Sequence, residues 1–114
     1  MVLNINDNDY ELNFGIRFLN QLNKLYEDKT SPVKIERGLV TLVANLSMMS
    51  PVALLDGIMA STYKQKPILT EDKVEEWLEE QDINEMCESF LEQLKTSPMT
   101  KGMMAKLVDE DSLY

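Results

Sequence analysis

The sequence contains no histidine and only one cysteine among its 114 residues. Without histidine, the chain lacks the side chain that most often transfers protons near neutral pH and that often binds transition metals. Because Cys87 has no second cysteine to pair with, neither an intramolecular disulfide nor a cysteine-rich zinc site can form. A lone thiol of this kind is typical of a reducing cytoplasm. Nucleophilic sites of the Ser-His-Asp or Cys-His type are therefore excluded, and we expect no metal and no cofactor.

Long apolar runs are missing as well. The most apolar stretch, residues 38–59, is interrupted by Asn45, Pro51 and Asp56. It therefore lacks the roughly 18 consecutive apolar residues of a membrane-spanning helix. The first residues contain neither a basic region nor a long apolar segment, which argues against a secretory signal. The sequence predicts a soluble protein with no membrane partner.

Acidic residues outnumber basic ones, and the excess lies in one part of the chain. The net charge is −9, which disfavours nucleic acids and anionic membranes as partners. Residues 1–70 hold seven acids and seven bases, whereas residues 71–114 hold thirteen acids and four bases. At 44% hydrophobic residues, the composition is sufficient for the core of one domain.

The first fourteen residues show the alternation of a β-hairpin. Leu3 and Ile5 alternate with asparagines, and Tyr10, Leu12 and Phe14 alternate with polar residues. The segment 6–9 between them contains only Asn and Asp, which tolerate the left-handed backbone of a tight turn. Since two isolated strands are marginal in water, we expect their apolar face to pack on the helices that follow.

From residue 16 onward, apolar residues recur at helical spacing. The predicted helices cover residues 16–26, 35–49, 51–62, 71–78, 83–94 and 99–107, and a polar loop is expected at 28–34. Residues suited to capping a helix N-terminus precede four of these helices: Ser50-Pro51, Thr70, Asp82 and Ser97-Pro98. The fold class is thus mainly α, with a short N-terminal β-hairpin followed by a compact bundle of five to six short helices. One domain is expected over residues 1–108, divided into the hairpin at 1–14 and the helices at 15–108, with a frayed tail at 109–114.

The apolar residues also suggest how the helices pack. The helix at 35–49 is the most apolar and is expected to be central. On the next helix, Val52 and Leu55 are assigned to the inner side, and Gly57 suggests close packing against a neighbour. Trp77 is interpreted as a packing anchor, and Cys87 as a passive buried thiol.

No catalytic arrangement is visible. The glutamates of the helix at 71–78 and of the residues after it lie on its outer face, where nothing would raise a pKa for acid catalysis. Eight methionines are many for this length, and methionine suits surfaces that accept apolar segments of varying shape. The candidate partner-binding residues are Leu46, Met48, Met49 and Met59, with Met99, Met103 and Met104 as a second patch.

The order of several motifs resembles one protein family over nearly the whole chain. Similar motifs occur in the tail assembly chaperones of long-tailed bacteriophages of Gram-positive hosts. The segments that carry the resemblance are Asp9-Tyr10-Glu11-Leu12-Asn13-Phe14-Gly15, Phe18-Leu19-x-x-Leu22-x-x-Leu25-Tyr26, Gly38-Leu39-x-x-Leu42, Pro51-Val52-x-x-Leu55, Ala60-Ser61-Thr62, the acidic helix around Trp77, Phe90-Leu91-x-x-Leu94-Lys95 and Ser97-Pro98-Met99-Thr100-Lys101.

The resemblance implies a binding protein of the infected cell. Members of this family bind the tape measure protein and keep it soluble while the tail tube polymerises around it. They act in many copies, in the host cell cytoplasm, and are absent from the mature virion. The implied partners are the tape measure protein, the major tail protein, a frameshifted longer form of the chain and further copies of itself.

Two other classes are open at this point. One is a structural head-tail or tail-completion protein that is retained in the virion. The other is an acidic mimic that inhibits a host nucleic-acid-binding protein, although the acids cluster on one or two helices beside good apolar stripes. An enzyme is the class that the sequence favours least.

Overall fold

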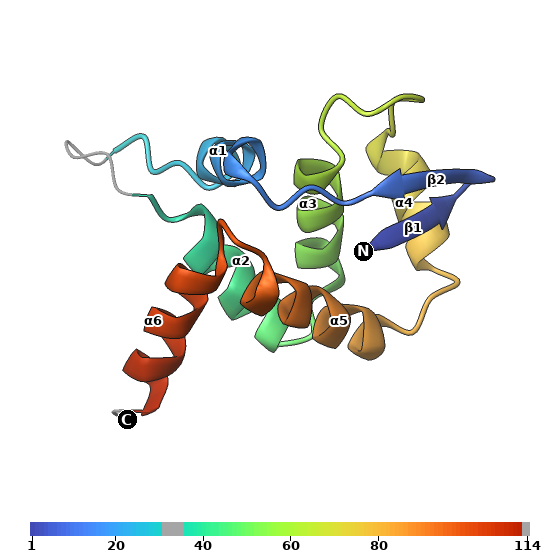
Figure 1. Ribbon diagram of the computed structural model, residues 1–114. Helices are drawn as coiled ribbons and strands as arrows, with labels where there is room; N and C mark the ends of the chain where they lie inside the picture. The colour runs from blue at the N-terminus through green and yellow to red at the C-terminus, as the bar shows by residue number, and fades with distance from the viewer. Residues whose placement is uncertain (31–35, 113–114) are drawn as a thin grey trace.

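A computed structural model describes residues 1–30 and 36–112, except for the side chains of 108–112. The described residues form a two-stranded antiparallel hairpin followed by six helices (Figure 1), which confirms the predicted fold class. The elements are β1 Val2–Ile5, β2 Asn8–Glu11, α1 Ile16–Leu25, α2 Gly38–Ser47, α3 Pro51–Ser61, α4 Glu71–Leu78, α5 Ile83–Thr96 and α6 Lys101–Ser112. Part of the loop predicted at 28–34, and the start of the helix predicted at 35–49, lie outside the described residues.

The hairpin closes through a two-residue turn. Asn6 and Asp7 have φ angles of 54° and 65°, the left-handed backbone that this kind of turn requires. Asn4 pairs with Asp9, and Ile5 with Asn8. The inward side chains of both strands are buried, as the alternation predicted.

Three hydrogen bonds attach the hairpin and the residues after it to the helical part. The Tyr10 hydroxyl donates to the carbonyl oxygen of Pro67 at 2.6 Å. The backbone N–H of Asn13 donates to the carbonyl oxygen of Ser61, at the end of α3, at 2.9 Å. The Gln65 side-chain amide donates to the carbonyl oxygen of Glu11. The hairpin therefore lies against the C-terminal end of α3.

Three predicted caps are present. The side chains of Ser50, Thr70 and Asp82 accept hydrogen bonds from backbone N–H groups three residues further on. Each satisfies one of the backbone donors that a helix start leaves without an intrahelical partner. These bonds fix the starts of α3, α4 and α5.

The central helix is α3, not the predicted helix at 35–49. It packs against α1, α2, α4 and α5, and Figure 1 shows it in the middle of the fold. Gly57 allows this close packing, because a Cβ at that position would lie 2.8 Å from Cζ of Phe90 on α5. The close approach that Gly57 suggested is thus observed.

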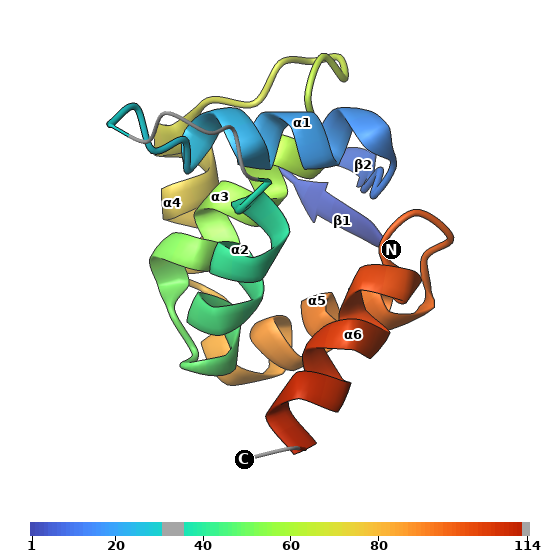
Figure 2. The ribbon, with the colours of Figure 1, turned by 90° about the vertical axis from the view of Figure 1, so that its left-hand side faces the viewer.

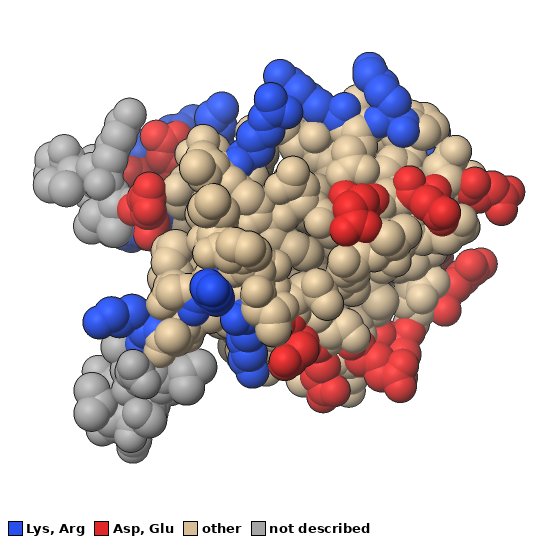
Figure 3. All heavy atoms as spheres, in the orientation of Figure 1, with Lys and Arg blue, Asp and Glu red and all other residues tan. Residues whose placement is uncertain are grey.

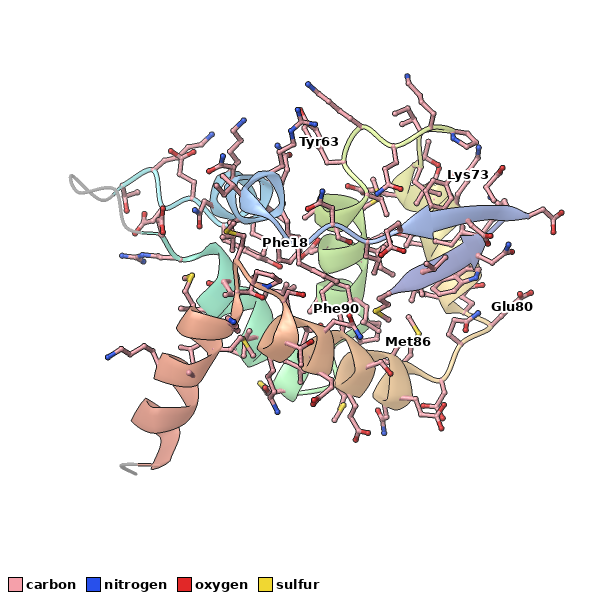
Figure 4. The ribbon with its side chains drawn as sticks, in the orientation of Figure 1. Phe18, Tyr63, Lys73, Glu80, Met86 and Phe90 are labelled. Atoms are coloured by element: carbon pink, nitrogen blue, oxygen red, sulfur yellow. The ribbon has the colours of Figure 1, made fainter. Side chains whose placement is uncertain are left out.

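Aromatic rings fill the space between the hairpin segment, α1 and α5 (Figure 4). The ring of Phe14 meets those of Phe18 and Phe90 edge to face, each at a centroid distance of 5.2 Å. Phe18 and Phe90 are almost completely buried. Rings in this arrangement contribute about 0.5–1.5 kcal/mol per pair beyond the area they bury.

The contact between α1 and α2 depends on Asn23 and Gly38. The Asn23 side-chain oxygen accepts a hydrogen bond from the backbone N–H of Gly38 at 2.9 Å, so a side chain of α1 caps the start of α2. A second polar contact joins α1 to α3, where the hydroxyl of Tyr26 donates to Oδ2 of Asp56 at 2.6 Å. Burial and the Asp56 carboxylate raise the pKa of Tyr26.

The last helix runs further than the sequence indicated. It continues to Ser112, whereas a frayed tail was expected from residue 109; residues 113–114 lie outside the described part. The division into one domain stays a prediction. Among the helices of the described residues, none has both the length and the apolar character needed to cross a bilayer.

Candidate partner-binding site

The turn between α5 and α6 presents Met99 to solvent. Ser97 does not cap α6 as predicted, because its hydroxyl donates back to the carbonyl oxygen of Gln93 at 2.7 Å and so helps to end α5. The buried Thr100 hydroxyl donates to the carbonyl oxygen of Leu94 at 2.6 Å. Helix α6 therefore starts at Lys101 rather than near residue 99, and the two hydroxyl bonds hold a turn in which Met99 is 55% exposed.

This turn forms one wall of an open hollow, here called the hairpin groove. Its volume is about 620 Å³. The apolar part of its lining consists of Met1, Leu12, Phe14, Pro98 and Met99. Figure 2 shows the α5–α6 turn beside the N-terminus and β1, as the lining requires. The polar part includes side-chain amides from the segment after the hairpin and from α5, so the groove can contact both apolar groups and hydrogen-bonding groups of a partner.

A second hollow, the α3–α4 groove, is smaller and has an acidic rim. It measures about 380 Å³ and lies between the start of α3 and the end of α4. Val52 and Leu55 line it from α3, with Leu78 and Ile83 opposite, and Glu75 and Glu79 are also part of the lining. This arrangement suits an apolar side chain that is flanked by basic ones.

The structure does not place Val52 as predicted. Val52 is 66% exposed and does not belong to the inner side of α3, whereas Leu55 is partly buried and packs against the core. That side is formed by Ala53, Leu54, Gly57 and Ile58. Val52 lies in the first turn of α3, two residues after the Ser50 cap. The sequence contained a signal for the exposure of Val52, because the Ser50 cap and Pro51 mark Val52 as a residue at the end of a helix.

The seven candidate residues do not form one continuous surface. Leu46 and Met104 are buried in the core, so they do not contact a partner in this conformation. Met48 is 80% exposed at the turn after α2. Met99 is the one candidate that lines the hairpin groove. The other three are partly buried: Met49, Met59 and Met103. None of the seven lines the α3–α4 groove.

The charged side chains are unevenly distributed over the surface. Figure 3 shows lysines and arginines along the upper edge, carboxylates at the right and lower right, and side chains of both signs at the left of this view. Lys73 and Glu80, which come from the start and the end of the α4 region, are labelled in Figure 4. Four glutamates of this region are exposed, as expected for an outer face: Glu75, Glu76, Glu79 and Glu80.

Cys87 is completely buried. Burial raises the pKa of its thiol, and the neighbouring charge of Glu88 raises it further. The thiolate is therefore disfavoured, which agrees with the interpretation as a passive thiol. In the described part of the chain, no cluster of three or more Asp, Glu or Cys side chains is arranged to hold a metal ion.

Comparison with known protein families gives one match. The family model for the phage tail assembly chaperone protein matches residues 2–109, nearly all of the chain. The chain belongs to the phage tail assembly chaperone family. Comparison with curated proteins and with solved structures finds no match. The resemblance to phage tail assembly chaperones is thus confirmed, and the family assigns the chain a role in phage tail assembly, with tail proteins as its partners.

Proposed function

We propose that this tail assembly chaperone binds the tape measure protein of a long-tailed phage of a Gram-positive host and keeps it soluble while the tail tube assembles. The family match over residues 2–109 carries the proposal. The chain acts by binding and not by catalysis, in the cytoplasm of the infected cell, and is absent from the mature virion. The major tail protein and a frameshifted longer form are further proposed partners.

Exposed apolar side chains support this role. A tape measure protein is a long helix with much apolar surface, and such a client needs apolar contacts that adapt to different sequences. Met99 in the hairpin groove and Met48 after α2 offer such contacts, since both are more than half exposed and methionine adapts its shape easily. Met49 directly follows Met48, Met103 lies in α6 shortly after Met99, and both are partly buried.

The client-binding role is tested by co-expression with the tape measure protein encoded in the same genome. We expect the tape measure protein to be recovered in the soluble fraction only when this chain is present. Recovery that is equally poor with and without the chain contradicts the proposal. Mass spectrometry of purified particles tests the alternative, because a head-tail or tail-completion protein is found in them in stoichiometric amounts.

Single substitutions test the proposed contacts. Met99→Ser and Met48→Ser remove exposed apolar side chains, so each should lower the yield of soluble client without changing the helix content of the chain. Val40→Ser is the matched control, because Val40 is an apolar residue that is 44% exposed on α2 and is not one of the proposed contact residues. If Val40→Ser lowers the yield as much as the methionine variants do, these contacts are not specific.

A further inference from the structure

The α3–α4 groove combines an open apolar wall with two unpaired carboxylates. On α3, Val52 is exposed and Leu55 is only partly buried, and both line the groove. On α4, Glu75 and Glu79 are exposed, and within the described residues neither carboxylate takes part in a hydrogen bond or an ion pair. The groove thus offers apolar area next to negative charge that the described part of the chain does not neutralise.

The surroundings of the groove are also acidic. Residues 71–88 hold nine acids and one base, Lys73. Lys73 lies two residues before Glu75, a spacing that places the two side chains on different faces of α4. Helix α3 contains no base, and its one charged residue, Asp56, accepts a hydrogen bond from the hydroxyl of Tyr26. The groove therefore favours a positively charged partner over a neutral or an acidic one.

The spacing of the two glutamates matches a helix as the occupant. They are four residues apart on α4, so about 6 Å separates them along the helix axis. Basic residues at positions i and i+4 of a partner helix have the same spacing, and apolar residues at i+3 and i+7 lie in the row beside them. In an extended segment, the residue next to a basic one points to the opposite face. A helix can therefore place lysines over the glutamates and leucines against Val52 and Leu55 at the same time.

We propose that the α3–α4 groove binds basic amphipathic helical segments of the client, with their apolar side chains against α3 and their lysines or arginines against Glu75 and Glu79. The inference rests on the proposed function, because the tape measure protein supplies the helix. The volume of about 380 Å³ is at the lower end of the range for small-ligand pockets, so the groove holds a few side chains and not a folded domain. The chain thereby selects client segments whose apolar residues are flanked by bases at i and i+4.

Binding of a labelled synthetic helix to the chain alone tests the groove. The probe has about 18 residues, enough to form a helix in water, and carries lysines at i and i+4 and leucines at i+3 and i+7. A second peptide has glutamates in place of the lysines. In fluorescence anisotropy at about 50 mM salt, Glu75→Gln with Glu79→Gln should weaken binding of the lysine peptide about fivefold or more.

A matched control separates the groove from the net charge of the chain. Glu88→Gln with Glu92→Gln changes the net charge equally, and these exposed glutamates are also four residues apart, but they lie on α5 and do not line the groove. This variant should bind the lysine peptide nearly as well as the wild type does. If the two glutamine variants bind it equally well, the attraction is not specific to the groove and the proposal is wrong.

The apolar wall is tested by one exposed side chain. Val52→Ser should weaken binding of the lysine peptide about fivefold, because it removes apolar area that the leucines would cover. Val40→Ser is its control, since Val40 is an exposed valine in the first turn of α2, at the end of that helix farther from α3 in the chain. Equal binding by the two serine variants contradicts an apolar contact at Val52.

Reversal of the two charges gives the decisive result. Glu75→Lys with Glu79→Lys should bind the glutamate peptide more tightly than the lysine peptide, a gain that loss of folding cannot produce. Glu88→Lys with Glu92→Lys should keep the preference of the wild type for the lysine peptide. A groove variant that keeps this preference overturns the proposal.

Co-expression separates this inference from the proposed function. Glu75→Gln with Glu79→Gln should lower the yield of soluble tape measure protein, whereas the α5 control should not. If the groove variant keeps the client as soluble as the wild type does, the groove is not a client site, although the proposed function stands. If the wild type binds the lysine peptide and leaves the client insoluble, the proposed function fails, and with it the assignment of the helix to the client. Self-association that the groove variant abolishes would place a second copy in the groove and overturn the proposal.

Discussion

Replacing Gly38 by alanine adds a methyl group where α1 and α2 already touch. The new Cβ would lie 2.6 Å from the backbone N of Asn23 and from both the carbonyl carbon and Cβ of Leu22. Carbon atoms in ordinary contact are about 3.5–4.0 Å apart, so α1 and α2 must separate. The backbone of α1 cannot yield easily, because Phe18 and Leu22 fix it in the core.

The size of the effect follows from three contributions. Adding a methyl group to a packed interior costs about 1–3 kcal/mol, and the upper end applies when backbone atoms must move. Separation of the helices also lengthens the bond from the Gly38 N–H to the Asn23 side chain, which contributes about 0.5–1.5 kcal/mol. The better helix propensity of alanine returns at most about 1 kcal/mol. We expect a net loss of about 2–3 kcal/mol in the free energy of unfolding.

Urea unfolding followed by circular dichroism measures this loss. With a slope of about 2 kcal/mol per M, the midpoint should fall by about 1–1.5 M. Gly102→Ala is the matched control, because a Cβ built at Gly102 would meet no atom within 4 Å other than its chain neighbours and the backbone of its own helix. It should leave the midpoint unchanged or raise it slightly. A Gly38→Ala variant as stable as this control would refute the close packing of α1 on α2.

Three further predictions concern single side chains. Gly57→Ala should cost about 1 kcal/mol in urea unfolding, less than Gly38→Ala, because a phenylalanine ring and not backbone must shift. Tyr26→Phe should lower the free energy of unfolding by about 1–2 kcal/mol near pH 7. Because the pKa of Tyr26 is raised in the folded state, the stability difference between wild type and variant should shrink as pH rises above about 10. A difference that stays constant with pH contradicts the Asp56 contact. Cys87 should react with a thiol reagent about a hundredfold more slowly in the native chain than in urea, and equal rates would exclude its burial.

The features that the sequence predicted are set by residues close together in the chain. The hairpin follows from alternating side chains and from Asn6 and Asp7, which accept left-handed backbone. The caps at Ser50 and Asp82 depend only on the next three residues, so a local pattern was sufficient to find them.

The features that were missed depend on contacts between distant segments. Asn23 caps a helix that begins 15 residues later, and nothing in the local sequence marks it as a capping residue. Ser97 has two acceptable hydrogen-bond arrangements, and the buried Thr100 bond to α5 favours the one that ends the helix. Met104 follows the partly buried Met103 and lies near the exposed Met99, yet the packing of α6 on α5 buries it. The number of methionines therefore does not show which of them reach the surface.

The two grooves lie on different parts of the surface. The hairpin groove is lined from residues 1–15, Gln65 and residues 93–99, whereas the α3–α4 groove is lined from residues 51–55 and 75–83. Gln65 lies between Lys64 and Lys66, but its side chain is directed toward the hairpin by its bond to Glu11. A partner seated in the α3–α4 groove would therefore leave Met99 accessible to a client in the hairpin groove, because no residue lines both grooves.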